Sequence, residues 1–243
     1  RGLGDVYKRQ VMDIPGFSSA RSSYFHKTIG GYHAAKLTRY NDLIEHQISK
    51  GNPYVLNMLN AKYFLTGDGD YRMNPEAFGN AWLVDTLTYV STPAEEMEAL
   101  GSLVHRNTAV ADRKFAATIG ESSPISEGDT IYETSYAPNR LTYKARLAKE
   151  GVAAFSEVYF PWGWKATVNG KETPIGRVNY ALRAMRLPAG ESDIVMTFEP
   201  ESVKKANAVS MASVGIIYLL IICAIANVAG ALIRKGKKQS PNA

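Results

Sequence analysis

A long uncharged apolar stretch near the C-terminus constrains this chain more than any other feature of its sequence. Residues 208–233 read AVSMASVGIIYLLIICAIANVAGALI and contain no Asp, Glu, Lys or Arg. At about 1.5 Å per residue the stretch gives a helix of about 39 Å, which crosses a hydrocarbon core of about 30 Å with some tilt. A buried helix of a soluble domain is the alternative, but only Ser210, Ser213 and Asn227 interrupt the apolar surface. We therefore predict a transmembrane helix over residues 204–233.

The charges on the two sides of this helix predict its orientation. The tail, residues 234–243, carries four cations and no acid, whereas residues 199–205 carry two cations and two acids. The positive-inside rule places the more cationic flank in the cytoplasm. We expect a cytoplasmic tail, an extracytoplasmic main region and a location in the cell membrane. The position of the helix, late in the chain, distinguishes it from a signal peptide.

The net charge does not indicate a nucleic-acid partner. Without the four tail cations the formal charge falls from +5 to +1, and without residues 1–10, which carry +2, it falls to −1. The basic excess suits anionic lipid headgroups, and the main region lacks the basic footprint of nucleic-acid binding. The lone cysteine, Cys223, lies in the predicted helix, so we expect a domain stabilised by its core without disulfides.

The first part of the chain mixes helix and strand signals. Residues 1–10 join abruptly to the segment after them, and we treat them as a doubtful or artefactual start. Residues 11–119 are expected to form a mixed α/β extracytoplasmic region. Within it, the apolar spacing over residues 36–50 predicts an amphipathic helix, and AWLVDTLTYV at residues 81–90 predicts one buried strand. Ser-Thr-Pro at residues 91–93, followed by two acids, predicts a helix start.

The second part of the chain follows a period of two. Residues 120–129 are rich in Gly, Ser and Pro, so we expect a domain boundary or a long linker there. In residues 139–148 apolar and polar side chains alternate, and the Asn169-Gly170 pair favours a type I′ hairpin. We therefore predict that residues 120–203 form an antiparallel β-sandwich-like module. For the whole chain we predict an α+β fold with one transmembrane helix.

Catalytic and metal motifs are absent from the sequence. The four histidines form no HxH or HExxH spacing, and the GDGD turn at residues 67–70 lacks the later ligands of a calcium loop. No GxSxG, GxxxxGK[ST] or GxGxxG is present. We expect no catalytic residue, no metal and no cofactor in this chain.

Two groups of residues are candidates for ligand binding. Tyr159, Trp162 and Trp164 lie in an aromatic run that stacks on sugar rings or lies at a membrane interface, with core packing as the alternative. Cations and imidazoles cluster around a Gly-Gly pair before the first helix, where they suit an anionic phosphate, with a solvated helix entry as the alternative. The residues of this second group are His26, His33, Lys36 and Arg39.

Several ordered segments give the sequence a family resemblance. They are ARSSYFHKTIGGYHAAKLTRYNDLI, LNAKYFLTGDG, NPEAFGNAWLVDTLTYVSTPAEEMEAL, RLTYKARLAKEGVAAFSEVYFPWGWKATVNGKE and RLPAGESDIVMTFEPES. In this order they resemble the C-terminal part of the bacterial YfhO family of polytopic membrane proteins, from Val11 to the tail. The run from Tyr159 to Trp164 has one aromatic more than the family pattern.

The resemblance implies a large GT-C-like membrane protein that transfers a sugar from a polyprenyl-phosphate carrier to a cell-envelope acceptor. The catalytic acid of such proteins lies on an early extracytoplasmic loop, which this chain does not contain. The implied partners are the lipid bilayer, an N-terminal transmembrane bundle of the same protein, and a polyprenyl-phosphate sugar or an envelope glycan. We therefore expect the non-catalytic extracytoplasmic portion of such a protein. The alternative is a C-terminally anchored surface or adhesion protein with a β-sandwich binding module.

Overall fold

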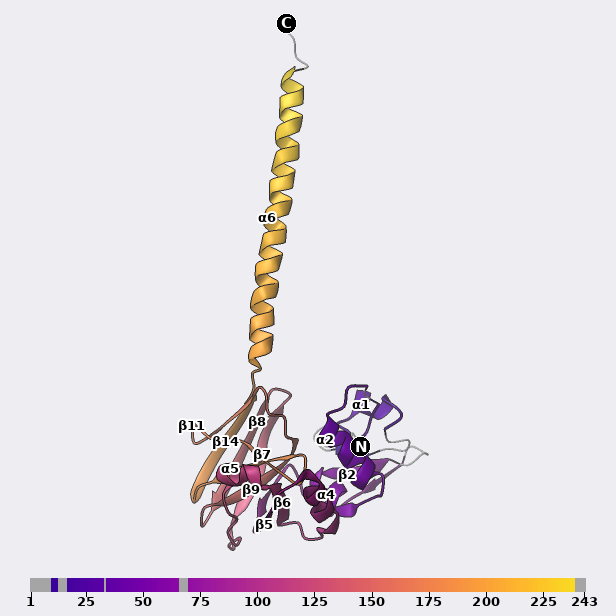
Figure 1. Ribbon diagram of the computed structural model, residues 1–243, viewed down its shortest axis with the longest axis vertical. Coiled ribbons are helices and arrows are strands. Elements are labelled where there is room, and N and C mark those ends of the chain that lie inside the picture. Colours follow the sequence, from indigo (N-terminus) through magenta and orange to yellow (C-terminus); the bar gives the residue numbers. More distant parts are fainter. Residues whose placement is uncertain (1–9, 13–16, 33, 66–69, 239–243) are drawn as a thin grey trace. The chain divides into compact units, whose positions relative to one another are not determined.

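The computed structural model describes residues 10–12, 17–32, 34–65 and 70–238, which fall into two compact units (Figure 1). The first unit ends at Phe198 and the second begins at Glu199. The predicted α+β class is confirmed, because helices and antiparallel sheets build the first unit and one long apolar helix builds the second. The predicted GDGD turn lies largely outside the described residues, as do nine residues of the doubtful start.

The larger sheet of the first unit has five strands in the order β11-β10-β14-β8-β7, and all neighbours are antiparallel. Its strands are β7 (Thr130–Ala137), β8 (Arg140–Leu147), β10 (Trp164–Val168), β11 (Lys171–Glu172) and β14 (Gly190–Phe198). In β8 the burial alternates as the sequence predicts. The predicted hairpin is also present, since Asn169 and Gly170 both have positive φ, 52° and 78°.

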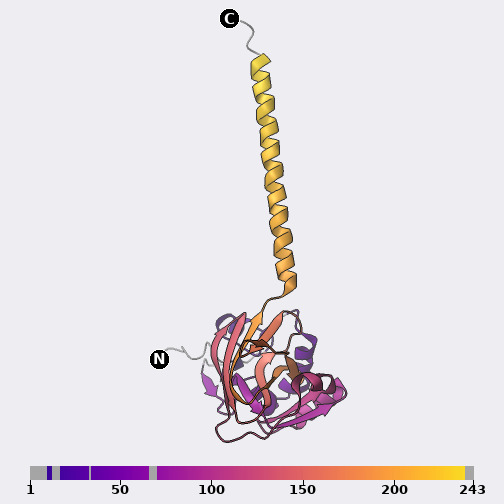
Figure 2. The same cartoon turned by 90° about the vertical axis from the view of Figure 1, so that its left-hand side faces the viewer.

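A four-stranded antiparallel sheet, in the order β12-β13-β9-β4, is the second layer of a sandwich (Figure 2). Its strands are β4 (Ala81–Val84), β9 (Gly151–Val158), β12 (Gly176–Val178) and β13 (Leu182–Leu187). Both sheets contribute to one core, where Tyr143 and Met196 meet Phe155 and Met185, each at most 1% exposed. The sandwich-like module is confirmed.

The strand β4 connects the two parts of the chain that the sequence analysis treats separately. It pairs with β9, which follows residues 120–129 in the sequence. The four-stranded sheet therefore contains strands from both sides of this stretch. The prediction of one strand over residues 81–90 is wrong. The chain breaks at Asp85, whose N–H donates to the Asn107 carbonyl at 2.9 Å, and β5 (Thr86–Val90) then pairs in parallel with β6 (Thr108–Asp112). All four residues of β4 are buried. If the strand continued, it would bury the charged side chain of Asp85, which is costly.

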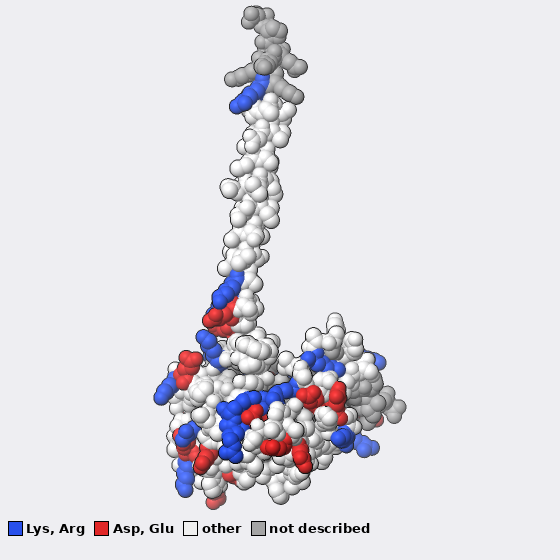
Figure 3. Space-filling model, viewed as in Figure 1, with Lys and Arg blue, Asp and Glu red and all other residues white. Residues whose placement is uncertain are grey.

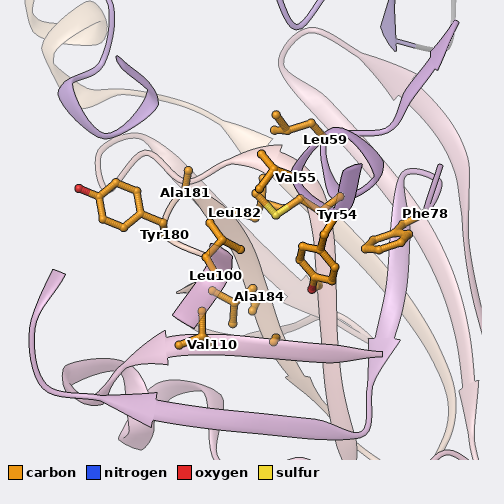
Figure 4. Packing of buried hydrophobic residues seen from close by; sticks show 14 of the residues in the cluster. Tyr54, Val55, Leu59, Phe78, Leu100, Val110, Tyr180, Ala181, Leu182 and Ala184 are labelled. Atoms are coloured by element: carbon orange, nitrogen blue, oxygen red, sulfur yellow. The ribbon is translucent and has the colours of Figure 1, made fainter. Parts of the chain in front are cut away.

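Short elements surround a second hydrophobic core. They are α1 (Arg21–Phe25), α2 (Thr38–Leu43), η2 (Ile44–Ile48), α3 (Pro53–Met58), α4 (Pro93–Ser102), η3 (Arg113–Phe115), α5 (Ala116–Ile119), β1 (Gln10–Met12), β2 (Ala61–Leu65) and β3 (Tyr71–Met73). Tyr54 packs edge-on against Phe78 with ring centroids 5.2 Å apart. Leu100, Val110 and Leu182 belong to the same core (Figure 4). These contacts bring α3, α4, β6 and β13 together.

The helix predicted over residues 36–50 is present as α2 continued by the wider π turn η2. Leu43, Ile44 and Ile48 are its buried face, as the spacing predicts. The helix start predicted at residues 91–93 is also confirmed, because Thr92 caps α4 by accepting the Glu95 N–H at 3.2 Å. Both helices therefore follow from local sequence.

The second unit is the helix α6 (Glu201–Lys238), which extends the predicted helix at both ends. It is long and apolar enough to cross a membrane: its most apolar window has a mean hydropathy of 2.5, and none of that window is buried in the described chain. Figure 3 shows no charged side chain along its middle. A core helix of a soluble domain would hide most of this surface, whereas lipid tails accept it.

A carboxylate with no solvent exposure joins α4 to its neighbours. Glu96 Oε2 accepts a hydrogen bond from Arg177 Nη2 at 2.7 Å and lies 3.6 Å from Arg39 Nη1. Its Oε1 accepts the Tyr180 N–H at 3.0 Å. Burial raises the pKa of Glu96, and the charge of Arg177 opposes that rise. One side chain thus holds α2, α4, β12 and the turn that follows β12.

We predict that the substitution Arg177→Gln lowers the free energy of unfolding of the full chain by about 3–5 kcal/mol near neutral pH, because Glu96 loses its nearest counter-charge. The change also moves the folded-state pKa of Glu96 further above its unfolded value. The stability that Glu96 contributes is then present at about pH 4 and is lost as pH rises through the folded pKa. Chemical denaturation in detergent at several pH values measures this loss.

The double variant Glu96→Gln/Arg177→Gln is the matched control, because it keeps Asp112 but has no carboxyl at position 96 to titrate. It should lack the additional pH dependence of the single variant. A deficit in Arg177→Gln that is the same at about pH 4 and pH 8 would contradict a charged interaction at this position.

Candidate functional site

A cavity of about 450 Å³ lies where the start of α2, the helix η3 and the segment after β9 meet. We call it the aromatic pocket. Its lining residues are Leu37, Thr38, Arg39, Tyr40, Lys114, Phe115, Val158, Tyr159, Phe160, Pro161, Trp162, Arg177 and Ala181. Its size falls within the range of about 300–1,000 Å³ that is usual for small-molecule sites.

Four aromatic rings form one wall of this pocket. Phe115 packs edge-on against Tyr159 with ring centroids 5.5 Å apart, and Phe160 packs in the same way against Trp162 at 5.2 Å. Trp162 is 68% exposed, which is unusual for a residue with so large an apolar ring. The wall therefore presents flat apolar faces to a ligand.

Three cations line the pocket beside these rings. Lys114 Nζ lies 5.4 Å and Arg177 Cζ lies 5.0 Å from the Phe115 ring centroid. Lys114 pairs with Asp112 at 2.9 Å, and Arg177 pairs with Glu96. The third cation, Arg39, is 31% exposed. Since both carboxylates already bind these cations, the remaining guanidinium and ammonium donors are what the pocket offers to an anion.

A turn in which two residues have positive φ follows the strand that carries Arg177, one of the cations of the pocket. Asn179 has φ 50° and Tyr180 has φ 68°, and neither is a glycine. Asn179 is fully buried and exchanges hydrogen bonds with the backbone of Val110, from its N–H at 2.7 Å and to its Oδ1 at 3.0 Å. Such conformations persist only where the surroundings hold them, and they concentrate at functional sites.

The Tyr180 side chain links this turn to α2. Its hydroxyl donates to Asp42 Oδ2 at 2.7 Å, and the Arg39 guanidinium lies 4.5 Å from its ring centroid. Burial, together with the hydrogen bond and charge of Asp42, raises the pKa of Tyr180 to about 12. The hydroxyl is therefore a hydrogen-bond donor at physiological pH, and the stacked ring fixes the position of Arg39.

Three of the residues predicted from the sequence meet in the pocket, namely Arg39, Tyr159 and Trp162. They come from both predicted groups, which are far apart in the chain. Lys36 lines an adjoining cavity of about 280 Å³, where its Nζ lies 5.7 Å from the Phe17 ring centroid.

The other predicted residues lie elsewhere. Arg183 Cζ lies 3.8 Å from the Trp164 ring centroid, the Phe198 ring packs against the same indole at 5.2 Å, and Trp164 lines neither cavity. His26 is half-buried and lines neither cavity, and His33 lies outside the described residues.

The sequence analysis missed Lys114, Phe115 and Arg177. Lys114 and Phe115 lie in the short helix η3 that follows the buried strand β6, and a basic-aromatic pair just after a buried strand is a signal that could have identified them. Arg177 gave no such signal, since its role depends on the distant Glu96. The pocket combines stacking surfaces with cationic donors, which suits a sugar that carries an anionic group.

Comparison with known proteins finds a family match for part of the chain. Residues 127–210 match the family described as bacterial membrane protein YfhO. No curated protein and no solved structure matches the chain. The matched region contains every strand of the sandwich except β4, together with Tyr159, Trp162 and Arg177 of the pocket. Residues 127–210 of this chain are therefore similar to the YfhO family of bacterial membrane proteins, and the helix α6 is long and apolar enough to cross a membrane.

Proposed function

We propose that this chain is the non-catalytic extracytoplasmic portion of a YfhO-like membrane protein that glycosylates cell-envelope components with a sugar carried on polyprenyl phosphate. The aromatic pocket is the observation that carries the proposal. It sets four rings beside three cations, and Trp162 is open to solvent. A sugar linked to a phosphate has the two matching features, a ring with apolar faces and a negative charge.

The pocket suggests how such a ligand would bind. The sugar ring stacks on Trp162, while Arg39 and Lys114 donate to the phosphate oxygens. Leu37 and Pro161 add apolar surface for the first carbons of the lipid. Because α6 anchors the chain in the bilayer that holds the carrier, the effective concentration of the ligand is high, and weak contacts suffice.

The carboxylates near the pocket support a binding role without catalysis. Glu96 is fully buried and shared between Arg177 and Arg39, and Asp112 is paired with Lys114. The hydrogen bonds and charge of Lys114 outweigh desolvation and lower the pKa of Asp112, which weakens it as a general base. The transfer step therefore belongs to another part of the full protein, the proposed transmembrane bundle with which α6 would pack.

We predict that the main region is extracytoplasmic and the tail cytoplasmic, because the tail carries the excess of cations. In a Cys223→Ser background, an impermeant maleimide should label Lys171→Cys in intact bacteria. It should label Ser240→Cys only after lysis. Labelling of the tail variant alone in intact cells would reverse this orientation.

We predict that Trp162→Ala weakens binding of a farnesyl-phosphate-linked hexose about tenfold, because one stacking face is lost. The measurement is isothermal titration with the full chain in nanodiscs. Tyr24→Ala is the matched control, since Tyr24 is 84% exposed and lies outside the pocket. The chain by itself should transfer no sugar from this donor.

Two results would contradict the proposal. Equal affinities of the Trp162→Ala variant and the unchanged chain would remove the pocket from ligand binding. Sugar transfer by the purified chain would refute its non-catalytic role. The alternative function, an anchored surface or adhesion protein, predicts binding of an external ligand and no affinity for a carrier-linked sugar.

A further inference from the structure

A second cavity, of about 400 Å³, opens at one edge of the sandwich. It lies beside β7 and β4, which are the end strands of the two sheets. It shares no lining residue with the aromatic pocket. We call it the edge groove and define it by Asn60, Asn80, Arg106, Tyr132, Glu133 and Tyr136.

A β-bulge in β7 shapes this groove. Glu133 lies opposite Tyr143 and Tyr136 lies opposite Leu141, and the register shifts between Glu133 and Ser135. Residues three apart on a regular strand face opposite sides of a sheet. The extra residue of the bulge turns Glu133 and Tyr136 to the same side, that of the buried Tyr143 and Leu141. Bulges of this kind re-aim side chains at binding sites.

A chain of amide hydrogen bonds fixes the polar groups of the groove. Asn60 Nδ2 donates to Asn80 Oδ1 at 2.6 Å, and Asn80 Nδ2 donates to Glu133 Oε2 at 2.6 Å. Asn60 is 4% exposed and has φ 56°, so its own position is held by the backbone around it. The orientation of the Asn80 amide and of the Glu133 carboxylate is therefore set before a ligand arrives.

The groove does not favour a peptide strand as its occupant. Such a strand would pair with the free edge of β4, but Asn107 Nδ2 already donates to the Leu83 carbonyl at 2.7 Å. Arg106 Nη2 likewise donates to the Phe78 carbonyl at 2.7 Å, just before β4. Side chains that occupy edge carbonyls in this way block strand addition.

The chemistry of the groove favours a neutral polyhydroxylated ligand. The carboxylate of Glu133 and the cations Lys62 and Arg106 line the groove, and the charge of Lys27 interacts with Glu133, so charges of both signs are present. Amides and a carboxylate accept and donate hydrogen bonds in a fixed pattern, and Tyr136, which the bulge turns to the side of Glu133, adds an aromatic ring with Lys27 Nζ 3.0 Å from its centroid. We propose that the edge groove is a binding site for a neutral oligosaccharide, separate from the aromatic pocket.

Saturation-transfer NMR and isothermal titration of the full chain in nanodiscs test this proposal. The probes are maltotetraose and the tetramer of N-acetylglucosamine, with glucose 1-phosphate as the charged comparison. At least one neutral probe should bind. Tyr136→Ala and Glu133→Gln should each weaken that binding about tenfold, because the first removes the aromatic ring and the second a charged acceptor.

Tyr71→Ala is the matched control, since Tyr71 is also an exposed tyrosine but lies outside the groove. Trp162→Ala separates this site from the proposed function: it should leave binding of the neutral probe unchanged. The proposal is overturned if neither neutral probe binds, if only glucose 1-phosphate binds, or if Tyr136→Ala and Glu133→Gln bind as tightly as the unchanged chain.

Discussion

The buried carboxylate of Glu96 is the interaction on which the aromatic pocket depends. Glu96 is the only acid of α4 that is buried, and it contacts Arg177 of β12, Arg39 of α2 and the backbone of Tyr180. Removing a carboxylate from water is costly unless its partners compensate, so these groups are held closely together. Two of those partners, Arg177 and Arg39, also line the pocket. The same contact therefore stabilises the fold and positions the cations for a ligand.

Much of the fold could be predicted from the sequence, because local signals determine it. The alternation in β8, the Asn169-Gly170 turn and the uncharged helix α6 each depend on neighbours in the chain. Two features could not be found in this way. The bulge in β7 breaks the period of two, so that strand gave no signal. The break at Asp85 follows from the burial of β4, which only the assembled sheet shows.

The candidate site was only partly predictable, for the same reason. Residue type identified Arg39, Tyr159 and Trp162, since cations and aromatic rings have few roles on a surface. Arg177 became visible only through its contact with Glu96. Trp164 belongs to the same aromatic run of the sequence as Trp162, yet it packs against Arg183 and does not line the pocket. Pocket membership depends on tertiary contacts, which neither composition nor periodicity encodes.

The central claim is that a carrier-linked sugar binds between the rings and the cations of the aromatic pocket. A structure of the full chain in nanodiscs, determined by cryo-electron microscopy with a bound antibody fragment and a farnesyl-phosphate-linked hexose, tests it most directly. We predict density for the hexose against Trp162 and for the phosphate beside Arg39 and Lys114. A ligand found elsewhere on the chain, with this pocket empty, would contradict the account.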